Sequence, residues 1–412
     1  MSNLTATAGN TGPKVRSDCE ITIERKTEGG IIIDLKSKVK TLYGKAIEAE
    51  CREILNHFGI RDAAVKIFDT GALSFVLAAR IEAAVRQLTG TGSEYLPEMA
   101  ESNRYSTTRD RFRFTRLYLP GNTPSMMLNA GLHKSDGIIL DLEDSVATSK
   151  KDEARILVRN ALRVLDFRSA ERMVRINQGD TGLKDLQFVI PHNVNLVLIP
   201  KCDTPGQVTC VENEIALIKR NNNIGNPVYL MPIIESAAGV ENAYEIAKSS
   251  ESIVAMAIGI EDYTADLGVQ RTADGKESFY ARTRLVNAAR AAGIQAIDSV
   301  FADVNDMDSL TRNVHESRAL GFEGMGCIHP RQIAVIRNGF TPGEAEIERA
   351  KKIFLAFEEV KRRGLAVVSL GTKMIDPPVV ARAQKTIDLA VRLGLLAENW
   401  IDELPQEENL NA

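Results

Sequence analysis

The apolar run Val228-Tyr-Leu-Met-Pro-Ile-Ile234 is followed directly by Glu235, and a second run, Ile253-Val-Ala-Met-Ala-Ile-Gly-Ile260, is followed two residues later by Asp262. A helix-like segment at 240–248 separates the two runs. Two buried strands on either side of one helix are typical of a parallel βαβ unit. Carboxylates at the C-terminal ends of neighbouring parallel strands face one crevice, where oxygen ligands can hold a hard divalent cation. Either acid alone is more simply explained as a helix cap, but together Glu235 and Asp262 favour a metal site.

Outward from this unit, strand signals alternate with amphipathic stretches. The expected strands are 116–119, 137–142, 172–176, 196–200, 228–234, 253–259, 295–300 and 324–328. Eight parallel strands with intervening helices predict an α/β fold of the (β/α)₈ TIM-barrel class rather than an open doubly wound sheet. No Gly-x-Gly-x-x-Gly follows the first strand, which argues against a dinucleotide-binding fold.

A smaller α+β domain is expected ahead of the barrel. Its predicted elements are strands at 20–24, 31–35 and 63–68 and helices at 39–58 and 72–88. The turn Glu28-Gly-Gly30 between the first two strands predicts a β-hairpin. We expect a flexible polar arm over 1–18, the small domain over 19–92 and a linker with a basic end over 93–112.

The barrel is expected over 113–340, and a C-terminal segment over 341–400 follows it. This segment is predicted to contain a helix at 343–363, a short strand at 366–370, a turn at 371–378 and a helix ending near Leu396. The acidic tail 401–412 is expected to be disordered.

Composition limits the function classes. A net charge of −4 over 412 residues gives no reason to expect nucleic acid or an anionic membrane as partner. The apolar runs are too short for a membrane span, and no signal-peptide apolar region is present at the start. Five scattered cysteines without a Cys-x-x-Cys pair suit a reducing cytoplasm and argue against structural zinc.

Polar side chains at the C-terminal strand ends are the functional candidates of a barrel. Besides the two acids above, these ends carry Asp141, Glu143, Asp144, Arg175, Lys201, Glu261 and His329. Most of them, taken singly, are explained by ion pairs or caps. Asp144 fits a helix cap and a place beside the substrate equally well. Lys201 is more typical of an ion pair at the barrel mouth than of a Schiff base, and His329 of a packed or hydrogen-bonded side chain.

Arg175 is harder to explain as a surface residue. The order Val174-Arg-Ile176 directs it inward from a barrel strand, where a guanidinium needs a carboxylate partner from the protein or the substrate. Two acids, one planar cation and the lack of a Ser/His or Cys/His pair favour a metal-polarised carbonyl with a carboxylate held by Arg175. Reversible carbon–carbon cleavage through an enolate fits this set. Phosphoryl transfer does not, because no Gly-rich phosphate loop is present.

A series of motifs runs through residues 113–397: Leu119-Pro-Gly-Asn122, Leu140-Asp-Leu-Glu-Asp-Ser-Val146, Val174-Arg-Ile-Asn177, Ile199-Pro-Lys201, Ile234-Glu-Ser236, Gly259-Ile-Glu-Asp-Tyr263, Ala292-Gly-Ile-Gln-Ala-Ile-Asp298, Cys327-Ile-His-Pro330 and Lys373-Met-Ile-Asp376. In these motifs the region resembles the citrate lyase beta-subunit family, within the wider HpcH/HpaI aldolase-like group of citryl-, malyl- and citramalyl-thioester lyases.

The resemblance implies a TIM barrel with Mg²⁺ on Glu235 and Asp262, Arg175 on the keto-acid part, and Asp144 near the substrate and the waters of the metal site. Lys201 is a further substrate-binding candidate. It also implies a trimer or hexamer in which Asp376 enters the site of a neighbouring subunit as the acid/base group. From the residues alone, Asp376 before two prolines indicates only a turn.

Residues 17–92 resemble the acyl carrier (gamma) subunit of the same enzyme. Gly29-Gly-Ile-Ile-Ile-Asp-Leu35, Val39 with Tyr43-Gly44, and Asp69-Thr-Gly-Ala-Leu73 carry this match. In that family a serine just before an aspartate bears a phosphoribosyl-dephospho-CoA group. The corresponding arm here reads Arg16-Ser-Asp18, with Arg16 where the modified serine usually stands. Ser17 is therefore the candidate attachment site, and an unmodified arm is the alternative.

Three functions follow. The first is a fused carrier and lyase that cleaves a tethered citryl thioester to oxaloacetate and an acetyl thioester, with a separate acyl- or CoA-transferase (alpha) subunit as partner. In the second, the barrel cleaves free malyl-CoA, citramalyl-CoA or citryl-CoA, the small domain is a docking module, and the basic stretch 104–116 meets the CoA phosphates. The third is a non-catalytic scaffold for an acyltransferase.

Overall fold

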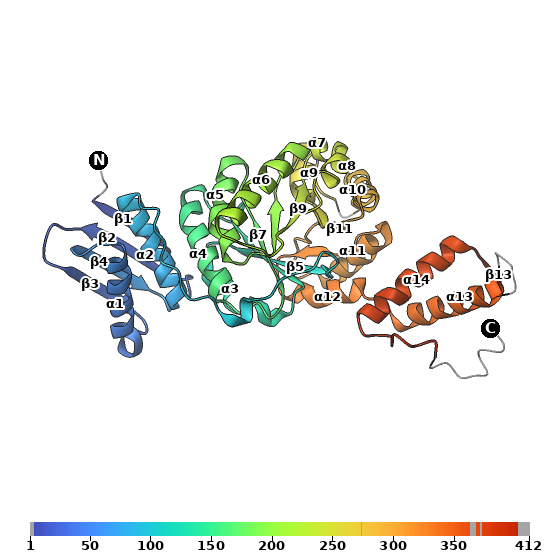
Figure 1. Ribbon diagram of the computed structural model, residues 1–412, viewed down its shortest axis with the longest axis horizontal. Coiled ribbons are helices and arrows are strands. Elements are labelled where there is room, and N and C mark those ends of the chain that lie inside the picture. Colours follow the sequence, from blue (N-terminus) through green and yellow to red (C-terminus); the bar gives the residue numbers. More distant parts are fainter. Residues whose placement is uncertain (1–3, 273, 363–367, 371–372, 403–412) are drawn as a thin grey trace. The chain divides into compact units, whose positions relative to one another are not determined.

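The computed structural model describes residues 4–272, 274–362, 368–370 and 373–402 (Figure 1). The chain divides into two compact units between Ile336 and Arg337. The first contains a small α+β domain and a barrel, and the second contains the C-terminal helices. None of the described helices is both long and apolar enough to cross a membrane.

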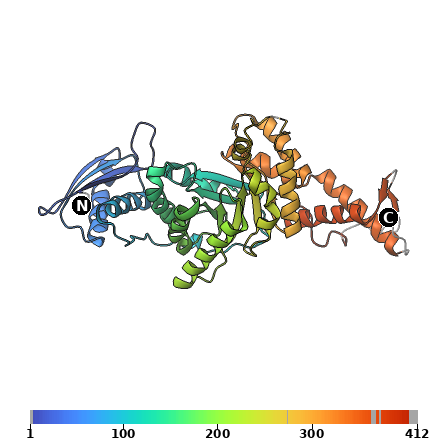
Figure 2. The ribbon, with the colours of Figure 1, turned by 90° about the horizontal axis from the view of Figure 1, so that it is seen from above.

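The N-terminal domain is a four-stranded sheet with two helices packed on it (Figures 1 and 2). Its elements are β1 (Thr5–Gly9), β2 (Cys19–Arg25), β3 (Ile31–Ser37), α1 (Lys40–His57), β4 (Ala63–Asp69) and α2 (Ser74–Thr89), and the strand order is β1-β2-β4-β3. The expected α+β domain is confirmed.

Two local predictions in this domain are wrong. The 20–24 and 31–35 strands do not form a hairpin, because β4 lies between them, antiparallel to β2 and parallel to β3. The crossover through α1 brings β4, with every second side chain buried, to the centre, whereas β3 is mostly exposed. The predicted flexible arm contains β1, whose residues pair with β2 from Thr5↔Glu24 to Gly9↔Glu20.

The barrel prediction is confirmed. Eight strands follow in the order expected: β5 (Thr115–Pro120), β6 (Gly137–Asp141), β7 (Glu171–Arg175), β8 (Leu196–Ile199), β9 (Tyr229–Ile234), β10 (Ala255–Ile258), β11 (Gln295–Ile297) and β12 (Met325–Cys327). Neighbours from β5 to β11 pair in parallel, and β12 pairs with β5. A parallel bridge between Asp298 and Met325 joins β11 to β12 and closes the sheet.

Helices surround these strands. They are α3 (Pro124–Met127), α4 (Lys151–Val164), α5 (Gly179–Val189), α6 (Pro205–Asn221), α7 (Ala237–Glu241), α8 (Ala243–Ala247), α9 (Ile260–Asp266), α10 (Phe279–Ala292), α11 (Met307–Leu320) and α12 (Arg331–Phe340), with 3₁₀ turns at Glu101–Asn103, Ala130–His133, Thr148–Lys150 and Ile190–His192. The single helix expected at 240–248 is split into α7 and α8. Side chains such as Ile139, Met173, Leu198 and Met231 fill the barrel interior, as close packing of a TIM barrel requires.

The predicted linker 93–112 is packed against the barrel at the end where the strands begin. Asn103 is buried, and Arg111 donates to the backbone carbonyl of Asp136, directly before β6. Arg113 is fully buried and makes a bidentate pair with Glu171 at 2.7 and 2.8 Å. The arginines from Arg104 to Arg113 therefore lie at the end of the strands opposite Glu235, so these residues do not support the expected contact of the basic stretch 104–116 with CoA phosphates. Arg116, the last residue of the stretch, lines the cavity at the mouth.

The second unit contains α13 (Glu344–Arg362), a hairpin of β13 (Val368–Leu370) and β14 (Lys373–Ile375), and α14 (Pro377–Arg392). The two helices pack through Ala350, Ala383 and Ile387, with Trp400 completing the cluster. The turn expected at 371–378 thus contains a strand. Residues 366–367 of the expected strand and 403–412 of the acidic tail lie outside the described residues.

Candidate functional site

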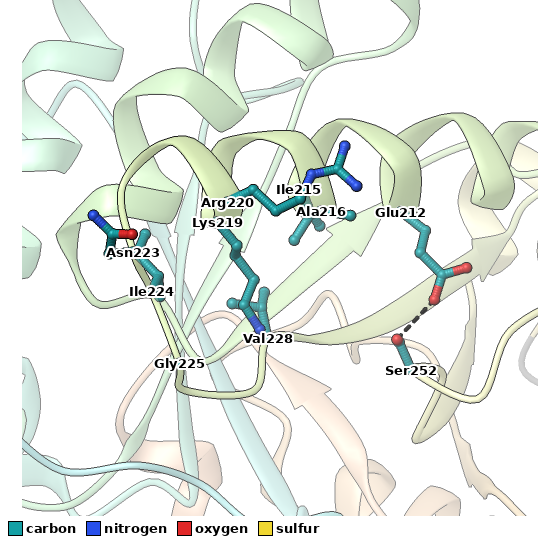
Figure 3. Close-up of a pocket in the computed structure, with 10 residues that line it drawn as sticks. All are labelled: Glu212, Ile215, Ala216, Lys219, Arg220, Asn223, Ile224, Gly225, Val228 and Ser252. Atoms are coloured by element: carbon teal, nitrogen blue, oxygen red, sulfur yellow. Dashed lines mark hydrogen bonds between the residues drawn. The ribbon is translucent and has the colours of Figure 1, made fainter.

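A cavity of about 850 Å³ opens at the C-terminal ends of the barrel strands. Its lining includes Arg116, Tyr118, Asp141, Asp144, Arg175, Glu235, Glu261, Asp262 and His329. A second hollow, of about 690 Å³, lies between α6 and the start of β9, at the other end of the strands (Figure 3). There Glu212 accepts a hydrogen bond from Ser252 at 2.8 Å, and Figure 3 shows no converging set of charged groups. We therefore place the candidate site at the first cavity.

Glu235 directly follows β9 and is 6% exposed. Its Oε2 accepts the backbone N–H of Lys201 at 3.0 Å. Burial, with the charges of Asp262 and Glu143, raises the pKa of Glu235 to about 8. A Cβ on Gly259 would lie 2.5 Å from Oε1 of Glu235, so only glycine leaves room for this carboxylate. Glu235 is thus a buried carboxyl group whose negative charge is not fully neutralised by the surrounding protein.

Asp262 lies in the first turn of α9, with 44% of its side chain exposed. Its charge raises the pKa of Glu235, so the two carboxylates share one electrostatic environment. In the part of the chain that the structure describes, no three His, Cys, Asp or Glu side chains are grouped to hold a metal. Mg²⁺ commonly uses one or two carboxylates and completes its shell with water and substrate. The Glu235–Asp262 pair fits that pattern.

Arg175, the last residue of β7, meets a protein carboxylate. Its Nε and Nη2 donate to Asp141 at 2.7 and 2.8 Å, and its Nη1 lies 2.9 Å from Oε2 of Glu143. Burial favours the neutral form of Asp141, but the hydrogen bonds and charge of Arg175 hold its pKa below the ordinary value. The ring of Tyr118 lies 5.5 Å from the guanidinium carbon. Asp141 therefore fixes the orientation of Arg175.

Lys201 follows β8 and joins the acids of the mouth. Its Nζ lies 3.5 Å from Asp262, 3.6 Å from Glu143 and 3.7 Å from Asp144. Its backbone φ is 46°, an uncommon conformation for a non-glycine residue. Asp144 is about half exposed and also lies 3.5 Å from Arg175. Lys201 thus forms ion pairs at the barrel mouth.

The other residues singled out from the sequence make different contacts, although Glu261 and His329 also line the cavity. Glu261 pairs with Arg271 at 2.6 Å, and Nδ1 of His329 accepts the N–H of Arg331 at 3.1 Å. Asp376 belongs to the second unit, where it caps α14 by accepting the N–H of Val379 at 3.1 Å. Ser17 belongs to the N-terminal domain.

Sequence reasoning missed three contributors to the cavity. Arg116 and Tyr118 are two apart on β5, the spacing of residues on one face of a strand. From the sequence, 116–119 is expected only to form a strand, and Arg116 to belong to the basic stretch 104–116. Gly259 carried a signal as the glycine that ends a buried strand. Its purpose depends on Glu235 of the neighbouring strand, a contact that only the fold creates.

Two sequence families match the chain. The HpcH/HpaI aldolase/citrate lyase family matches residues 115–330, and the malonate decarboxylase delta subunit (MdcD) family matches residues 4–88. The citrate lyase subunit beta of Leuconostoc mesenteroides subsp. cremoris is 40% identical over 286 residues, which cover 68% of this chain and 94% of the relative. The mitochondrial citramalyl-CoA lyase of Mus musculus is 31% identical over 327 residues, covering 74% and 97%.

A solved structure resembles the barrel. It is the protein CitE from Mycobacterium tuberculosis in complex with magnesium, acetoacetate and coenzyme A, at a TM-score of 0.57 and 28% identity, covering 69% of this chain and 99% of that one. These matches confirm the resemblance on which the sequence analysis drew. The chain therefore belongs to the HpcH/HpaI aldolase/citrate lyase family, as a homologue of the citrate lyase beta subunit preceded by an acyl carrier-like domain.

Proposed function

We propose that this chain is a Mg²⁺-dependent carbon–carbon lyase that cleaves a citryl thioester to oxaloacetate and an acetyl thioester. The observation that carries the proposal is the pair of acids at the barrel mouth, where Glu235 is buried and Asp262 raises its pKa. The citrate lyase beta subunit supports the choice of substrate, and magnesium with coenzyme A in the CitE structure supports the metal and the thioester.

Glu235 and Asp262 would hold Mg²⁺, which would supply Lewis-acid polarisation of the substrate oxygens. Arg175, held in place by Asp141, would bind the carboxylate of the keto-acid part with its Nη1, in place of the contact that Nη1 makes with Glu143 at 2.9 Å. Lys201 and Asp144, whose charged groups lie 3.7 Å apart at the mouth, would flank the substrate as a cation and an anion. These groups position the bond that breaks and offset its developing negative charge.

In the reaction a base removes the hydroxyl proton, the new keto group forms and the carbon–carbon bond breaks. The electron pair of that bond moves into the thioester half as an enolate, which is then protonated at carbon. We assign this acid/base role to Asp376 of a neighbouring subunit in a homotrimer or hexamer. The Val379 N–H accepted by its Oδ1 sets the orientation of the carboxyl group.

Attachment of a CoA-derived group to Ser17 would make the thioester carrier-bound. The next residue, Asp18, is buried and pairs with Arg80 at 2.9 Å. Arg80 also donates to Asn122 at 2.6 Å, in the loop that follows β5. The segment around Ser17 is thereby anchored on the same end of the strands as Glu235, which supports delivery of a tethered thioester to the mouth. A transferase (alpha) subunit would load the acyl group.

A second candidate function keeps the barrel chemistry but uses free malyl-CoA or citramalyl-CoA. Arg16, which stands where the carrier family has its modified serine, favours this alternative. So does the fixed docking of the small domain on α4 through Arg159 and Glu82, which suits an assembly module. A non-catalytic scaffold is the third possibility.

The deciding assay measures cleavage of citryl-CoA, citramalyl-CoA and malyl-CoA with Mg²⁺ and with EDTA. We expect Mg²⁺-dependent citryl-CoA cleavage that falls by roughly 10³-fold in Glu235→Gln and in Asp262→Asn, because charge stabilisation is lost. The matched control is Glu261→Gln, an acid next to Asp262 that pairs with Arg271. Equal activity in the three variants would contradict the metal assignment. Turnover restricted to malyl-CoA or citramalyl-CoA would support the second function. If no thioester is turned over, the result supports the non-catalytic scaffold.

Carrier modification is tested separately by the intact mass of the purified protein and of a Ser17→Ala variant. A large mass increment on the N-terminal peptide that disappears in the variant supports the carrier-bound substrate. An unmodified native mass after co-expression with the loading enzymes would leave only the free thioester.

A further inference from the structure

Arg116 is a charged side chain buried at the inner end of the mouth cavity. It lies on β5, is 1% exposed and lines the cavity. Its Nη1 approaches Sδ of Met231, a residue of the barrel interior, at 3.0 Å. The guanidinium therefore points into the barrel and marks the floor of the cavity.

This guanidinium lacks the partners that other buried arginines have. Within the described residues, Arg116 forms no ion pair with a carboxylate, and its Nε has no hydrogen-bond partner. Of the five other fully buried arginines, four pair with carboxylates, and these are Arg80, Arg113, Arg159 and Arg282. The fifth, Arg172, has no carboxylate partner either, but it donates to the carbonyl oxygens of Asn193 and Tyr105. Burial without such a partner lowers the pKa of Arg116. Burying a cation of this kind costs folding free energy unless an anion pairs with it.

Tyr118 connects this floor to the rest of the site. Its ring lies against Arg175 at the mouth, and the charges of both Arg116 and Arg175 oppose the rise that burial causes in its pKa. Through the pairing Arg116↔Gly137↔Glu171, the backbone of Arg116 is level with Glu171, four residues before Arg175 on β7. The cavity thus has one guanidinium near the acids of the mouth and another deeper in the barrel.

We propose that Arg116 is a specificity-determining residue that binds the second carboxylate of a 2-oxo dicarboxylate at the floor of the cavity. The inference rests on the proposed lyase function, in which the first carboxylate lies near Arg175. A guanidinium fork matches a carboxylate in geometry and charge. The site therefore favours thioesters whose oxo-acid half carries two carboxylates, as in citryl, over those that release pyruvate or glyoxylate.

The test is calorimetric binding of oxaloacetate and pyruvate to the full chain with Mg²⁺. In Arg116→Met we expect oxaloacetate affinity to fall by roughly 10- to 100-fold, the effect of losing a charged hydrogen-bond partner. Pyruvate affinity should change by less than about threefold on the same grounds. Arg116→Lys, which keeps the charge but not the fork, should lie between. The matched control is Arg172→Met, a buried arginine on β7 outside the cavity that bonds to the carbonyl oxygens of Tyr105 and Asn193.

The outcomes separate this inference from the lyase proposal. An unchanged ratio of oxaloacetate to pyruvate affinity in both Arg116 variants overturns the subsite, whatever the lyase assay gives. The same loss of ratio in Arg172→Met overturns it as well, because the effect would then be a general one on the barrel. If Glu235→Gln leaves the Mg²⁺-dependent binding of oxaloacetate and pyruvate intact, the assignment of the metal to Glu235 is wrong. The ratio of the two affinities still tests the role of Arg116 in that case. Thermal stability supplies a readout that is independent of activity. Without ligand, Arg116→Met should be more stable than the native chain, because a buried unpaired cation has been removed. With oxaloacetate this difference should disappear, because the native chain gains more stability from binding than the variant does.

Discussion

Buried charges are balanced along α4, where the N-terminal domain packs, and unbalanced at the barrel mouth. On α4, Arg159 is fully buried and pairs with Glu82 of α2 at 2.6 Å and with Glu94 at 2.9 Å. Nearer the start of the helix, Glu153 pairs with Arg80 at 3.3 Å and accepts the N–H of Gly9 at 3.0 Å. Each charge there has a protein partner of opposite sign.

At the mouth, by contrast, one buried carboxyl group and one buried guanidinium each lack a full protein partner of opposite charge. Burial and two neighbouring acids raise the pKa of Glu235, and Arg116 has no carboxylate partner among the described residues. The same barrel therefore contains charges that are paired within the protein and charges that lack a full protein partner, and the latter are the groups that we propose bind a ligand. Buried charges with a protein partner of opposite sign thus indicate a structural role, and buried charges without one indicate a functional role.

Breaking the balanced side should have the largest effect on stability. Arg159→Met removes three charge-assisted hydrogen bonds, two to Glu82 and one to Glu94, and leaves Arg86 as the remaining ion-pair partner of the buried Glu82. We expect a loss of about 3–5 kcal/mol in the free energy of unfolding. Denaturant unfolding measures it, and the double variant Arg159→Met/Glu82→Met should recover most of the loss. The contrast with the mouth comes from Asp262→Asn, where the loss should stay below about 1 kcal/mol. Equal losses at the two places would contradict the comparison.

The buried carboxyl group at the mouth should make the stability of the protein depend on pH. The pKa of Glu235 is raised from 4.5 to about 8, so the folded state holds a proton that the unfolded chain has released. Stability without metal is then fully present below pH 4.5 and is lost as pH rises through about 8, by roughly 5 kcal/mol at most. We expect Tm to fall between pH 6 and 9 in the native chain, less so with Mg²⁺, and to fall least in Glu235→Gln. A parallel fall in this variant would remove the assignment to Glu235.

Crowding the buried acid should weaken metal binding without unfolding the barrel. In Gly259→Ala the new Cβ meets Oε1 of Glu235 at 2.5 Å and displaces the carboxylate. Misplacing a metal ligand costs roughly 10- to 100-fold in affinity, measurable by Mg²⁺ titration. Gly206→Ala on α6, where the nearest atom would lie 3.8 Å away, is the control. Similar Mg²⁺ affinities in the two variants would show that the space at Gly259 is not needed.

The smallest effect is expected where charge meets solvent. Asp144 is 52% exposed, so Asp144→Asn should change stability by less than about 1 kcal/mol, and by less still at high salt. Asp141→Asn removes the buried partner of Arg175 and should cost about 3 kcal/mol. Denaturation of both variants at low and high salt compares them. If Asp144→Asn is as costly as Asp141→Asn, then exposure does not set the value of these pairs.

Much of the site could be located from sequence because barrel geometry is regular. Once 228–234 and 253–259 are taken as neighbouring parallel strands, Glu235 and Asp262 must face one crevice. The same logic directs Arg175 inward, and its contact with Asp141 confirms that it needed a carboxylate partner. The roles of Asp376 and Ser17 stay predictions, since neither local pattern specifies a site.

The sequence by itself determined the two-part organisation, the eight strands and the acids at their ends, because strand period and chain order are local properties. Only the tertiary structure decided which charges are balanced. Whether Arg116 lacks a carboxylate, whether β4 separates β2 from β3, and whether the basic linker faces the mouth all depend on contacts between residues far apart in the chain. Such contacts arise from burial in a shared interior, and no spacing along the sequence encodes them directly.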